Sequence, residues 1–282
     1  VFNTRRNNNG LWSLQYVDDA YCLDGSKAAY YAWTGAVEND DGIVVHLQGG
    51  GWCTNDDECA QRRDTRLGSS RTYAHSMYTH PDWYGSASLM DAFSDRRRYV
   101  VMYCDGGSWM GRSGRNTLIR TMNSIISKHR PRRILFTGCS AGGLGVIHAC
   151  GALQTYHSDI AFRCMHDGSL FFGNVSNIIL YHEGEHVHDT MELLEDNDTH
   201  FFTVTDWYDW DFVTRESCKQ SRSTCNDMER QIRHDRHTIV DRVRAKHPMW
   251  ITNTGHHCQL GHPLPSALRT QIRQYADDGG SN

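Results

Sequence analysis

The segment Ile134–Gly145 constrains the fold of this chain more than any other feature. It opens with Ile134–Thr137, a short run of apolar and β-branched residues that predicts a buried strand. Gly-Cys-Ser-Ala-Gly-Gly follows at once, and small residues continue beyond it. A serine flanked by glycines between a strand and a helix is typical of a nucleophile elbow, where bulky neighbours would clash. Ser140 is therefore the candidate nucleophile, and the alternative is a glycine-rich turn with an incidental serine.

Short apolar runs alternate with longer amphipathic runs through the rest of the 282 residues. Buried strands are predicted at Ile43–Leu47, Tyr99–Tyr103, Phe201–Val204 and Trp250–Thr252. Helices are predicted at Asn116–His129, Asn226–Lys246 and Leu264–Ala276. This alternation predicts an α/β fold of the α/β-hydrolase kind, with a mainly parallel sheet and helices on both faces. Because no repeat, low-complexity segment or linker interrupts the chain, residues 1–282 are expected to form a single domain.

A second glycine-rich segment follows the predicted strand Ile43–Leu47. Three consecutive glycines, Gly49 to Gly51, come directly after Gln48. In serine hydrolases of this fold, a loop after an early strand donates a backbone N–H to the oxyanion hole. The amides of Gly50 and Gly51, together with that of Ala141, are therefore the predicted donors. A flexible turn is the alternative interpretation.

A serine nucleophile needs a histidine base, and the base needs a carboxylate to orient it. In α/β-hydrolases the acid and then the base follow the nucleophile along the chain. Spacing alone does not choose between three candidates for each role. The candidate acids are Asp206, Asp209 and Asp211, and the candidate bases are His256, His257 and His262.

Several motifs, in order along the chain, resemble those of the pectin acetylesterase and Notum family of carbohydrate and lipid esterases. The matching segments are Tyr21–Ser26, Gln48–Cys53 with Cys59, Tyr103–Gly107, Gly138–Gly143, Asp167–Phe171, Tyr208–Asp209 and His257–Gln259. Two of these segments depart from the family pattern. The segment Asp167–Phe171 is altered, and Trp210 stands where a glutamine usually follows the acid motif. The departures concern the substrate more than the type of reaction.

The resemblance implies a complete catalytic triad. Carried over residue by residue, it gives Ser140 as nucleophile, Asp209 as acid and His257 as base. It also implies cleavage of carboxylic esters through an acyl-enzyme, without a metal or other cofactor. The expected substrate is an O-acetylated polysaccharide such as pectin. The alternative within the family is removal of a longer acyl chain from protein or lipid.

Three aromatic residues are candidates for the substrate pocket. Trp52 and Trp109 are the candidate walls of an acyl pocket, and Phe171 belongs to the segment that resembles the family's pocket lining. Core packing explains buried aromatic residues equally well.

The ten cysteines predict a disulfide framework and therefore a secreted protein, and the alternative is a cytosolic enzyme with many free thiols. Cys53 is expected to pair with Cys59, and Cys218 with Cys225 is the next local pair, whereas Cys139 is also interpreted as a small buried apolar residue. Two glycosylation sequons, at Asn174 and Asn197, fit a secreted glycoprotein from which a signal peptide has been removed.

Composition argues against several other classes of protein. The net charge is −4 and no basic block stands out, so no nucleic-acid partner is expected. Mean hydropathy is −0.61, and the longest apolar runs fall far short of the roughly 18 residues that a membrane span requires. The expected protein is a monomer whose partner is its esterified carbohydrate or other acylated substrate.

One motif points to a different class of enzyme. His182 and His186 have the His-Glu-x-x-His spacing that places two zinc ligands on one helix face, with Glu183 as base. Gly184 weakens such a helix by about 1 kcal/mol, and no Gly-x-x-His continuation follows. A zinc hydrolase is therefore one alternative, incidental surface metal binding by His182, His186 and His188 is another, and a solvated helix face is favoured. A carbohydrate-binding protein with a degenerate site is a third hypothesis, against which the complete Ser-Asp-His set argues.

Overall fold

The computed structural model describes most of the chain from residue 10 to residue 278. The described residues are 10–35, 37, 42–170, 194, 199, 201–206, 240–252, 254 and 256–278. Several predicted features lie outside these ranges, namely Phe171, Asn174, His182, His186, Asn197, Asp209, Asp211, Cys218, Cys225 and residues 226–239 of a predicted helix.

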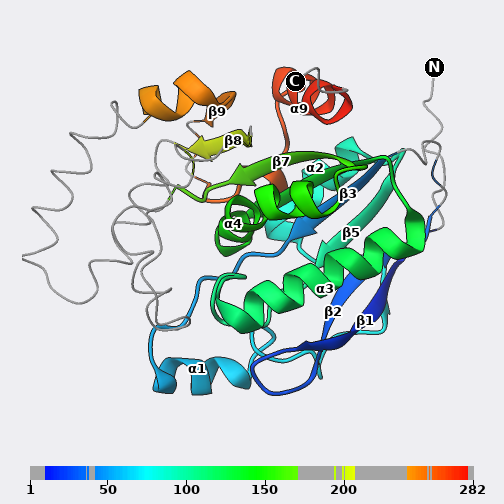
Figure 1. The fold of residues 1–282 in the computed structure, drawn as a ribbon, viewed down its shortest axis with the longest axis vertical. Coiled ribbons are helices and arrows are strands. Elements are labelled where there is room, and N and C mark those ends of the chain that lie inside the picture. Colours follow the sequence, from blue (N-terminus) through cyan, green and yellow to red (C-terminus); the bar gives the residue numbers. More distant parts are fainter. Residues whose placement is uncertain are drawn as a thin grey trace, which may run out of the picture.

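The described strands form one nine-stranded sheet, shown in Figure 1. Its order is β4-β1-β2-β5-β3-β6-β7-β8-β9. The antiparallel part comprises β1 (Trp12–Tyr21), β2 (Lys27–Trp33) and β4 (Ser76–Met77). The remaining strands are parallel: β3 (Gly42–Leu47), β5 (Arg97–Val101), β6 (Arg133–Cys139), β7 (Ala161–Asp167), β8 (Phe201–Asp206) and β9 (Met249–Thr252). The predicted mainly parallel sheet is therefore confirmed.

Helices cover both faces of the sheet (Figure 1). One face packs against α3 (Gly111–His129) and α4 (Ala141–Tyr156), and the other against α2 (Trp83–Ala92) and α9 (Ser266–Asp277). The shorter α1 (Asp56–Arg63) and the 3-10 helix η2 (Gln259–Gly261) belong to the loops that follow β3 and β9. Two separate apolar clusters fill the space between the sheet and its helices.

The central strand β3 illustrates why the chain adopts this layered arrangement. Ile43, Val45 and Leu47 belong to the cluster beneath α3 and α4, whereas Val44 belongs to the cluster beneath α2 and α9. All four side chains are at most 1% exposed. A strand that buries both faces needs a continuous apolar run, which the sequence supplies here. His46 departs from that run and is buried, with its Nε2 3.1 Å from a carboxylate oxygen of Asp82.

The antiparallel strands and the parallel strand β7 were not predicted from the sequence. β1 carries Asp18 and Asp19, which interrupt its apolar alternation. Asp19 has a φ of 57°, and the register with β2 shifts between Tyr16 and Tyr21, so the strand is irregular there. Predicted helix and strand ends differ from the observed ones by a few residues. The largest difference is α3, which begins at Gly111, five residues before the predicted start.

Four disulfides join the described part of the chain: Cys22–Cys104, Cys53–Cys59, Cys139–Cys258 and Cys150–Cys164. The expected Cys53–Cys59 pair is confirmed. The alternative interpretation of Cys139 as a small apolar residue is wrong, because this residue is bonded to Cys258. Disulfides in this number are typical of proteins from oxidising compartments.

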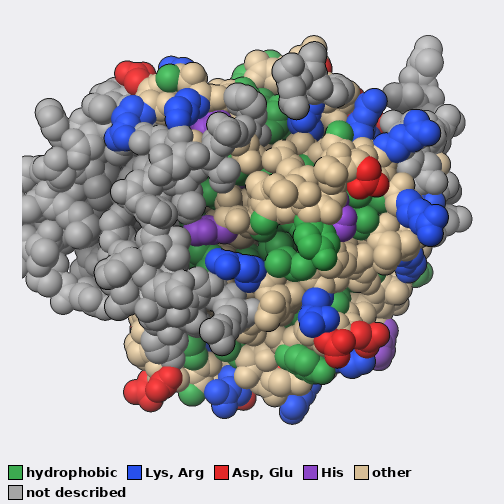
Figure 2. All heavy atoms as spheres, in the orientation of Figure 1, with side chains coloured by type: hydrophobic (Ala, Val, Ile, Leu, Met, Phe, Trp, Pro, Cys, Tyr) green, Lys and Arg blue, Asp and Glu red, His purple; other side chains and the backbone are tan. Residues whose placement is uncertain are grey.

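The surface and the helices carry two further observations. On the face shown in Figure 2, acidic and basic side chains of the described residues are scattered rather than gathered by sign. Within the described residues, no helix combines the length and the apolar character needed to cross a bilayer.

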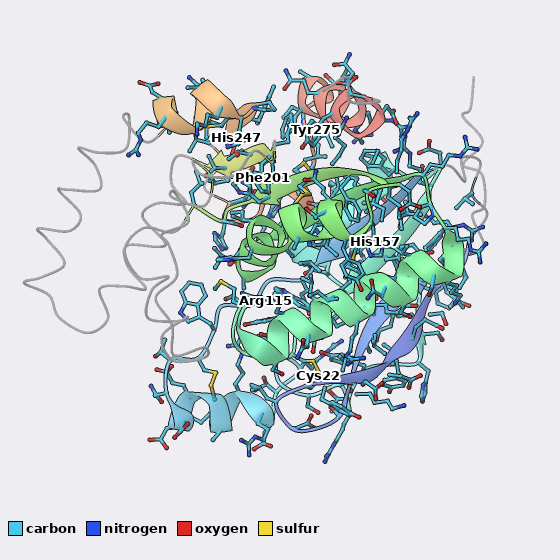
Figure 3. All side chains as sticks on the ribbon, in the orientation of Figure 1. Cys22, Arg115, His157, Phe201, His247 and Tyr275 are labelled. Carbon is cyan, nitrogen blue, oxygen red and sulfur yellow. A yellow bond between two sulfur atoms is a disulfide. The ribbon has the colours of Figure 1, made fainter. Side chains whose placement is uncertain are left out.

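Burial strongly lowers the pKa of three of the described histidines. Burial lowers the pKa of His166 to about 3 and the pKa of both His80 and His148 to about 4. His166 is wholly buried beside β8, where its Nε2 lies 3.0 Å from Thr203 Oγ1 and its ring packs on Phe201 (labelled in Figure 3). Because these pKa values lie below the ordinary value of 6.5, the rings stay neutral in the folded chain and take up protons more readily when it unfolds.

We expect the free energy of unfolding to fall as the pH drops from 6.5 towards 4, because protonation of these histidines favours the unfolded chain. Each group contributes up to about 1.4 kcal/mol per pH unit. Urea unfolding at several pH values measures the slope. His166→Gln keeps a polar partner for Thr203 and should flatten the slope, whereas substitution of the exposed His75 by Gln should not. Equal slopes for both variants would contradict the expectation.

Candidate active site

Ser140 occupies the turn between β6 and α4 in a strained backbone conformation. Its φ of 55° and ψ of −123° are uncommon for a residue with a side chain. Gly138 and Gly142 permit the turn. A Cβ on Gly138 would overlap the backbone of Gly142, and a Cβ on Gly142 would overlap the carbonyl oxygen of Leu47. The sharp strand-to-helix turn predicted from the glycine spacing is therefore present.

Hydrogen bonds to the end of β7 hold this turn in place. The backbone N–H of Ser140 donates to the carbonyl oxygen of Asp167 at 2.9 Å. The hydroxyl of Ser169 donates to the carbonyl oxygens of Ser140 and Asp167, at 3.0 and 2.8 Å. The turn is thus fixed by a neighbouring strand as well as by its own glycines, and Ser140 remains 8% exposed.

The loop after β3 runs directly against the turn that carries Ser140. A Cβ on Gly49 would lie 2.5 Å from the carbonyl oxygen of Cys139 and 3.1 Å from Ser140 Cβ, so the backbone comes closer than other residues allow. Gly51 has open space around it, but its φ of 64° favours glycine. The predicted glycine loop therefore lies beside the candidate nucleophile.

The segment after β5 fixes the glycine loop. The hydroxyl of Tyr103 donates to the carbonyl oxygen of Gly51 at 2.8 Å, and the Tyr103 amide donates to the side chain of Gln48 at 3.1 Å. Trp109 Nε1 donates to the Gln48 carbonyl oxygen at 3.1 Å. Trp109 is 2% exposed, so core packing accounts for its burial, whereas Trp52 in the loop is half-buried.

A buried carboxylate shapes this second segment. Asp105 accepts hydrogen bonds from the amides of Gly107 and Trp109, at 2.9 and 3.2 Å. Burial nevertheless raises its pKa to about 6, more than these hydrogen bonds lower it. Ser108 and Trp109 both have positive φ, 57° and 64°. Asp105 thus stabilises the strained turn that carries Trp109, whose indole N–H donates to the Gln48 carbonyl oxygen.

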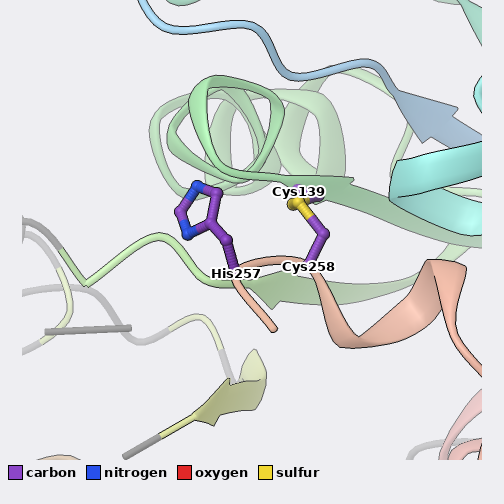
Figure 4. Close-up of side chains that lie close together, drawn as sticks. All are labelled: Cys139, His257 and Cys258. Atoms are coloured by element: carbon purple, nitrogen blue, oxygen red, sulfur yellow. A yellow bond between two sulfur atoms is a disulfide. The ribbon is translucent and has the colours of Figure 1, made fainter. Parts of the chain in front are cut away.

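A disulfide brings the predicted base to the nucleophile turn. Cys139, directly before Ser140, is bonded to Cys258, directly after His257 (Figure 4). A ring nitrogen of His257 lies within 4.8 Å of both sulfur atoms. Among the described residues, these three side chains form the one group with the spacing of metal ligands. Because both sulfurs are joined in a disulfide, they offer no thiolate to a metal.

The two other candidate bases interact with each other. The rings of His256 and His262 stack with centroids 3.6 Å apart and planes at 10°. Burial, followed by the neighbouring His256, lowers the pKa of His262. The side chain of Gln259 binds this loop internally, with its Nε2 donating to the His256 carbonyl oxygen at 2.5 Å and its Oε1 accepting from Thr254 Oγ1 at 3.0 Å.

The remaining predicted site residues are placed only in part. Ala141 is fully buried at the first position of α4, where its amide belongs to the free N-terminal turn of the helix. The backbone of Asp206 ends β8, and Asp209 and Phe171 lie outside the described residues.

Sequence reasoning assigned no role to two further residues at this site. Asp167 is buried at the end of β7, and its Oδ2 accepts the amide of Leu260 at 2.8 Å, which links the loop of the base to the strand beside the nucleophile. Arg62 reaches the carbonyl oxygens of Gly50 and Gly51 from α1. The sequence signal for Asp167 was its place in the segment Asp167–Phe171, which resembles the family's pocket lining, and Arg62 had no signal in the sequence.

Comparison with known proteins identifies similar sequences. Residues 7–203, more than half of the chain, match the family described as Pectinacetylesterase. The matched part includes Ser140 and the glycine loop, and it ends before His257.

Individual relatives support the same family. Pectin acetylesterase 5 of Arabidopsis thaliana is 30% identical over 57% of this chain and 41% of its own length. Pectin acetylesterase 4 of the same plant is 24% identical over 90% of this chain and 77% of its own length. The palmitoleoyl-protein carboxylesterase NOTUM of Schmidtea mediterranea is 25% identical over 45% of this chain and 27% of its own length. The chain thus spans less than half of the first of these relatives.

Proposed function

The chain belongs to the pectinacetylesterase family, and we propose that it is a serine carboxylesterase that removes O-acetyl groups from a pectin-like polysaccharide. One observation supports the proposal above the others: a disulfide joins Cys139, directly before the strained Ser140, to Cys258, directly after the candidate base His257, and a ring nitrogen of His257 lies within 4.8 Å of both sulfur atoms. Strain at a serine is costly and is found mostly at functional sites.

In the proposed reaction Ser140 attacks the ester carbonyl carbon. His257 takes the proton of the serine hydroxyl, and Asp209 orients the His257 ring. Collapse of the tetrahedral intermediate transfers this proton from His257 to the departing sugar oxygen and leaves an acetyl ester on Ser140. Water then attacks this ester and gives a proton to His257, which returns it to Ser140 as acetate departs.

The negative oxygen of each tetrahedral intermediate needs donors at fixed positions. We assign this role to the amides of Gly50, Gly51 and Ala141. The position of Ala141 at the start of α4 supports the assignment, because the helix dipole favours negative charge there. The close approach of Gly49 to Ser140 supports the placement of the loop. No metal or cofactor takes part in the proposed steps.

A second candidate substrate is a longer acyl chain on protein or lipid, favoured by the similarity to NOTUM. The match to pectin acetylesterase 4 covers 90% of this chain, so we favour acetyl esters as the substrate. Half-buried Trp52 next to the glycine loop is our candidate for the pocket wall. The disulfides support a secreted enzyme.

We expect the protein to hydrolyse p-nitrophenyl acetate faster than the corresponding palmitate, and a serine-reactive phosphonate to label Ser140 and stop turnover. Ser140→Ala should abolish both turnover and labelling while far-ultraviolet circular dichroism stays unchanged. A preference for long chains would support the second substrate. Activity that survives Ser140→Ala but is lost with a chelator would instead favour the zinc hydrolase.

We expect the kcat values of single variants to show which histidine is the base and which aspartate is the acid. His257→Ala should reduce kcat as much as Ser140→Ala, whereas His256→Ala should have a smaller effect because that ring stacks on His262. Asp209→Asn should cost more than Asp206→Asn, with kcat as the measurement. The reverse order in either pair would move the assignment to the other residue.

We expect loss of the Cys139–Cys258 bond to damage catalysis more than loss of a comparable disulfide elsewhere. The double variant C139A/C258A should lower kcat at least tenfold, since His257 is then no longer fixed beside Ser140. The matched control is C150A/C164A, which removes the bond between α4 and β7. Both variants should lose about 2–5 kcal/mol of stability. Equal kcat values in the two variants would show that the bond has no role in positioning.

A further inference from the structure

We propose that Arg62 is a positioning residue that orients the backbone amide of Gly51, one of the proposed oxyanion donors, towards the developing oxyanion. The inference rests on the proposed function, because it assigns a role within the same reaction. Arg62 acts through the carbonyl oxygens of Gly50 and Gly51 and needs no contact with the substrate.

Arg62 lies in the last turn of α1 and reaches back to the loop that precedes this helix. Its Nη2 donates to the carbonyl oxygen of Gly50 and, at 3.2 Å, to that of Gly51. Its guanidinium carbon lies over the ring of Tyr103, 5.3 Å from the centroid. The hydroxyl of Tyr103 donates to the same Gly51 oxygen at 2.8 Å. The side chains of Arg62 and Tyr103 therefore both donate hydrogen bonds to carbonyl oxygens of this loop.

Because the peptide unit is planar, a hydrogen bond that fixes a carbonyl oxygen also fixes the direction of the N–H group in the same peptide. No described peptide bond is cis, and in a trans peptide the carbonyl group and the following N–H point in opposite directions. Holding the carbonyl oxygen of Gly50 towards Arg62 therefore turns the N–H group of Gly51 away from Arg62. The contact with the Gly51 carbonyl oxygen fixes the next peptide group, whose N–H belongs to Trp52. Glycine backbones rotate easily. The hydrogen bonds, rather than steric limits, therefore keep the Gly51 amide in one direction.

The charge of Arg62 adds to its effect on direction. Hydrogen bonds from a guanidinium are roughly twice as strong as neutral ones, and they polarise the peptide groups that accept them. A polarised peptide has a more positive N–H, which is a better donor to a developing oxyanion. The charge of Arg62 also interacts electrostatically with the carboxyl group of Asp105. Asp105 is buried, as are Tyr103 and Trp109.

Both ends of α1 hold Arg62 in position. At the start of the helix, Asn55 caps the backbone by accepting the amide of Glu58 at 2.9 Å, and Cys59 is bonded to Cys53 of the glycine loop. At the end, the Arg62 carbonyl oxygen accepts the amide and the hydroxyl of Thr65, at 2.9 and 2.8 Å. The disulfide and the hydrogen bonds of Arg62 thus connect α1 to the glycine loop at two points.

The test compares substitutions at Arg62 by steady-state hydrolysis of p-nitrophenyl acetate. Arg62→Gln should lower kcat by about 10- to 100-fold, part of the roughly 100- to 1,000-fold loss that follows removal of an oxyanion donor. KM should change far less, because the bound substrate does not yet carry the oxyanion charge. Arg62→Lys keeps a point charge without the planar fork and should retain intermediate activity. Millimolar guanidinium should restore part of the kcat of Arg62→Ala.

The matched control is Arg63→Gln, at the exposed neighbouring position of α1. It makes the same change of charge without touching the glycine loop, and it should keep the kcat of the unsubstituted protein. Equal kcat values for Arg62→Gln and Arg63→Gln would overturn the inference. A loss in Arg62→Ala that appears only in thermal stability, with no rescue by guanidinium, would overturn it as well.

The unsubstituted protein separates failure of the inference from failure of the proposed function. Absence of ester turnover and of phosphonate labelling at Ser140 would overturn both. Turnover that depends on Ser140 but is insensitive to Arg62 would overturn the inference alone.

Discussion

The carboxyl ends of β3, β6 and β7 meet so closely that several positions between them have no room for a side chain. Gly138, Gly142 and Gly143 occupy these positions, and a Cβ on any of them would overlap a neighbouring group. Parallel pairing in register places Leu47 beside Gly138 and extends to the end of β7. The strand ends cannot separate without losing these pairings. The strained turn at Ser140 and the loop after β3 are consequently fixed against each other, and the remaining parts of the candidate site are arranged around this junction.

Covalent bonds hold the neighbouring loops to the same junction. Cys22–Cys104 ties the end of β1 to the segment after β5, Cys53–Cys59 closes the glycine loop on α1, and Cys139–Cys258 joins the nucleophile turn to the loop of His257. Two of these bonds connect cysteines 82 and 119 positions apart in the chain. Loops without regular structure are otherwise the most mobile parts of a protein. Placing disulfides at their ends gives short polar segments the rigidity that a preorganised site requires.

Local sequence patterns predicted the parallel strands β3, β5, β6, β8 and β9 but missed β7 and the antiparallel strands at the edge. The strand at Ile43–Leu47 is a continuous apolar run because both of its faces are buried, so its type and extent were readable. β1 has one face towards solvent and carries Asp18 and Asp19 at an irregularity, so its alternation was weak. The glycine turn at Ser140 was predictable for a different reason. A sharp turn leaves no room for side chains at Gly138 and Gly142, and this requirement is visible within a few residues of sequence.

The sequence by itself determined the α/β class, the nucleophile turn, the glycine loop and a local disulfide, because each depends on residues close together in the chain. Tertiary structure alone decided that Cys139 bonds to Cys258, that Asp167 binds the amide of Leu260, and that Arg62 binds the glycine carbonyls. These contacts depend on which loops meet at the carboxyl edge of the sheet. Strand order sets that meeting, and strand order results from the packing of the whole chain rather than from any local pattern.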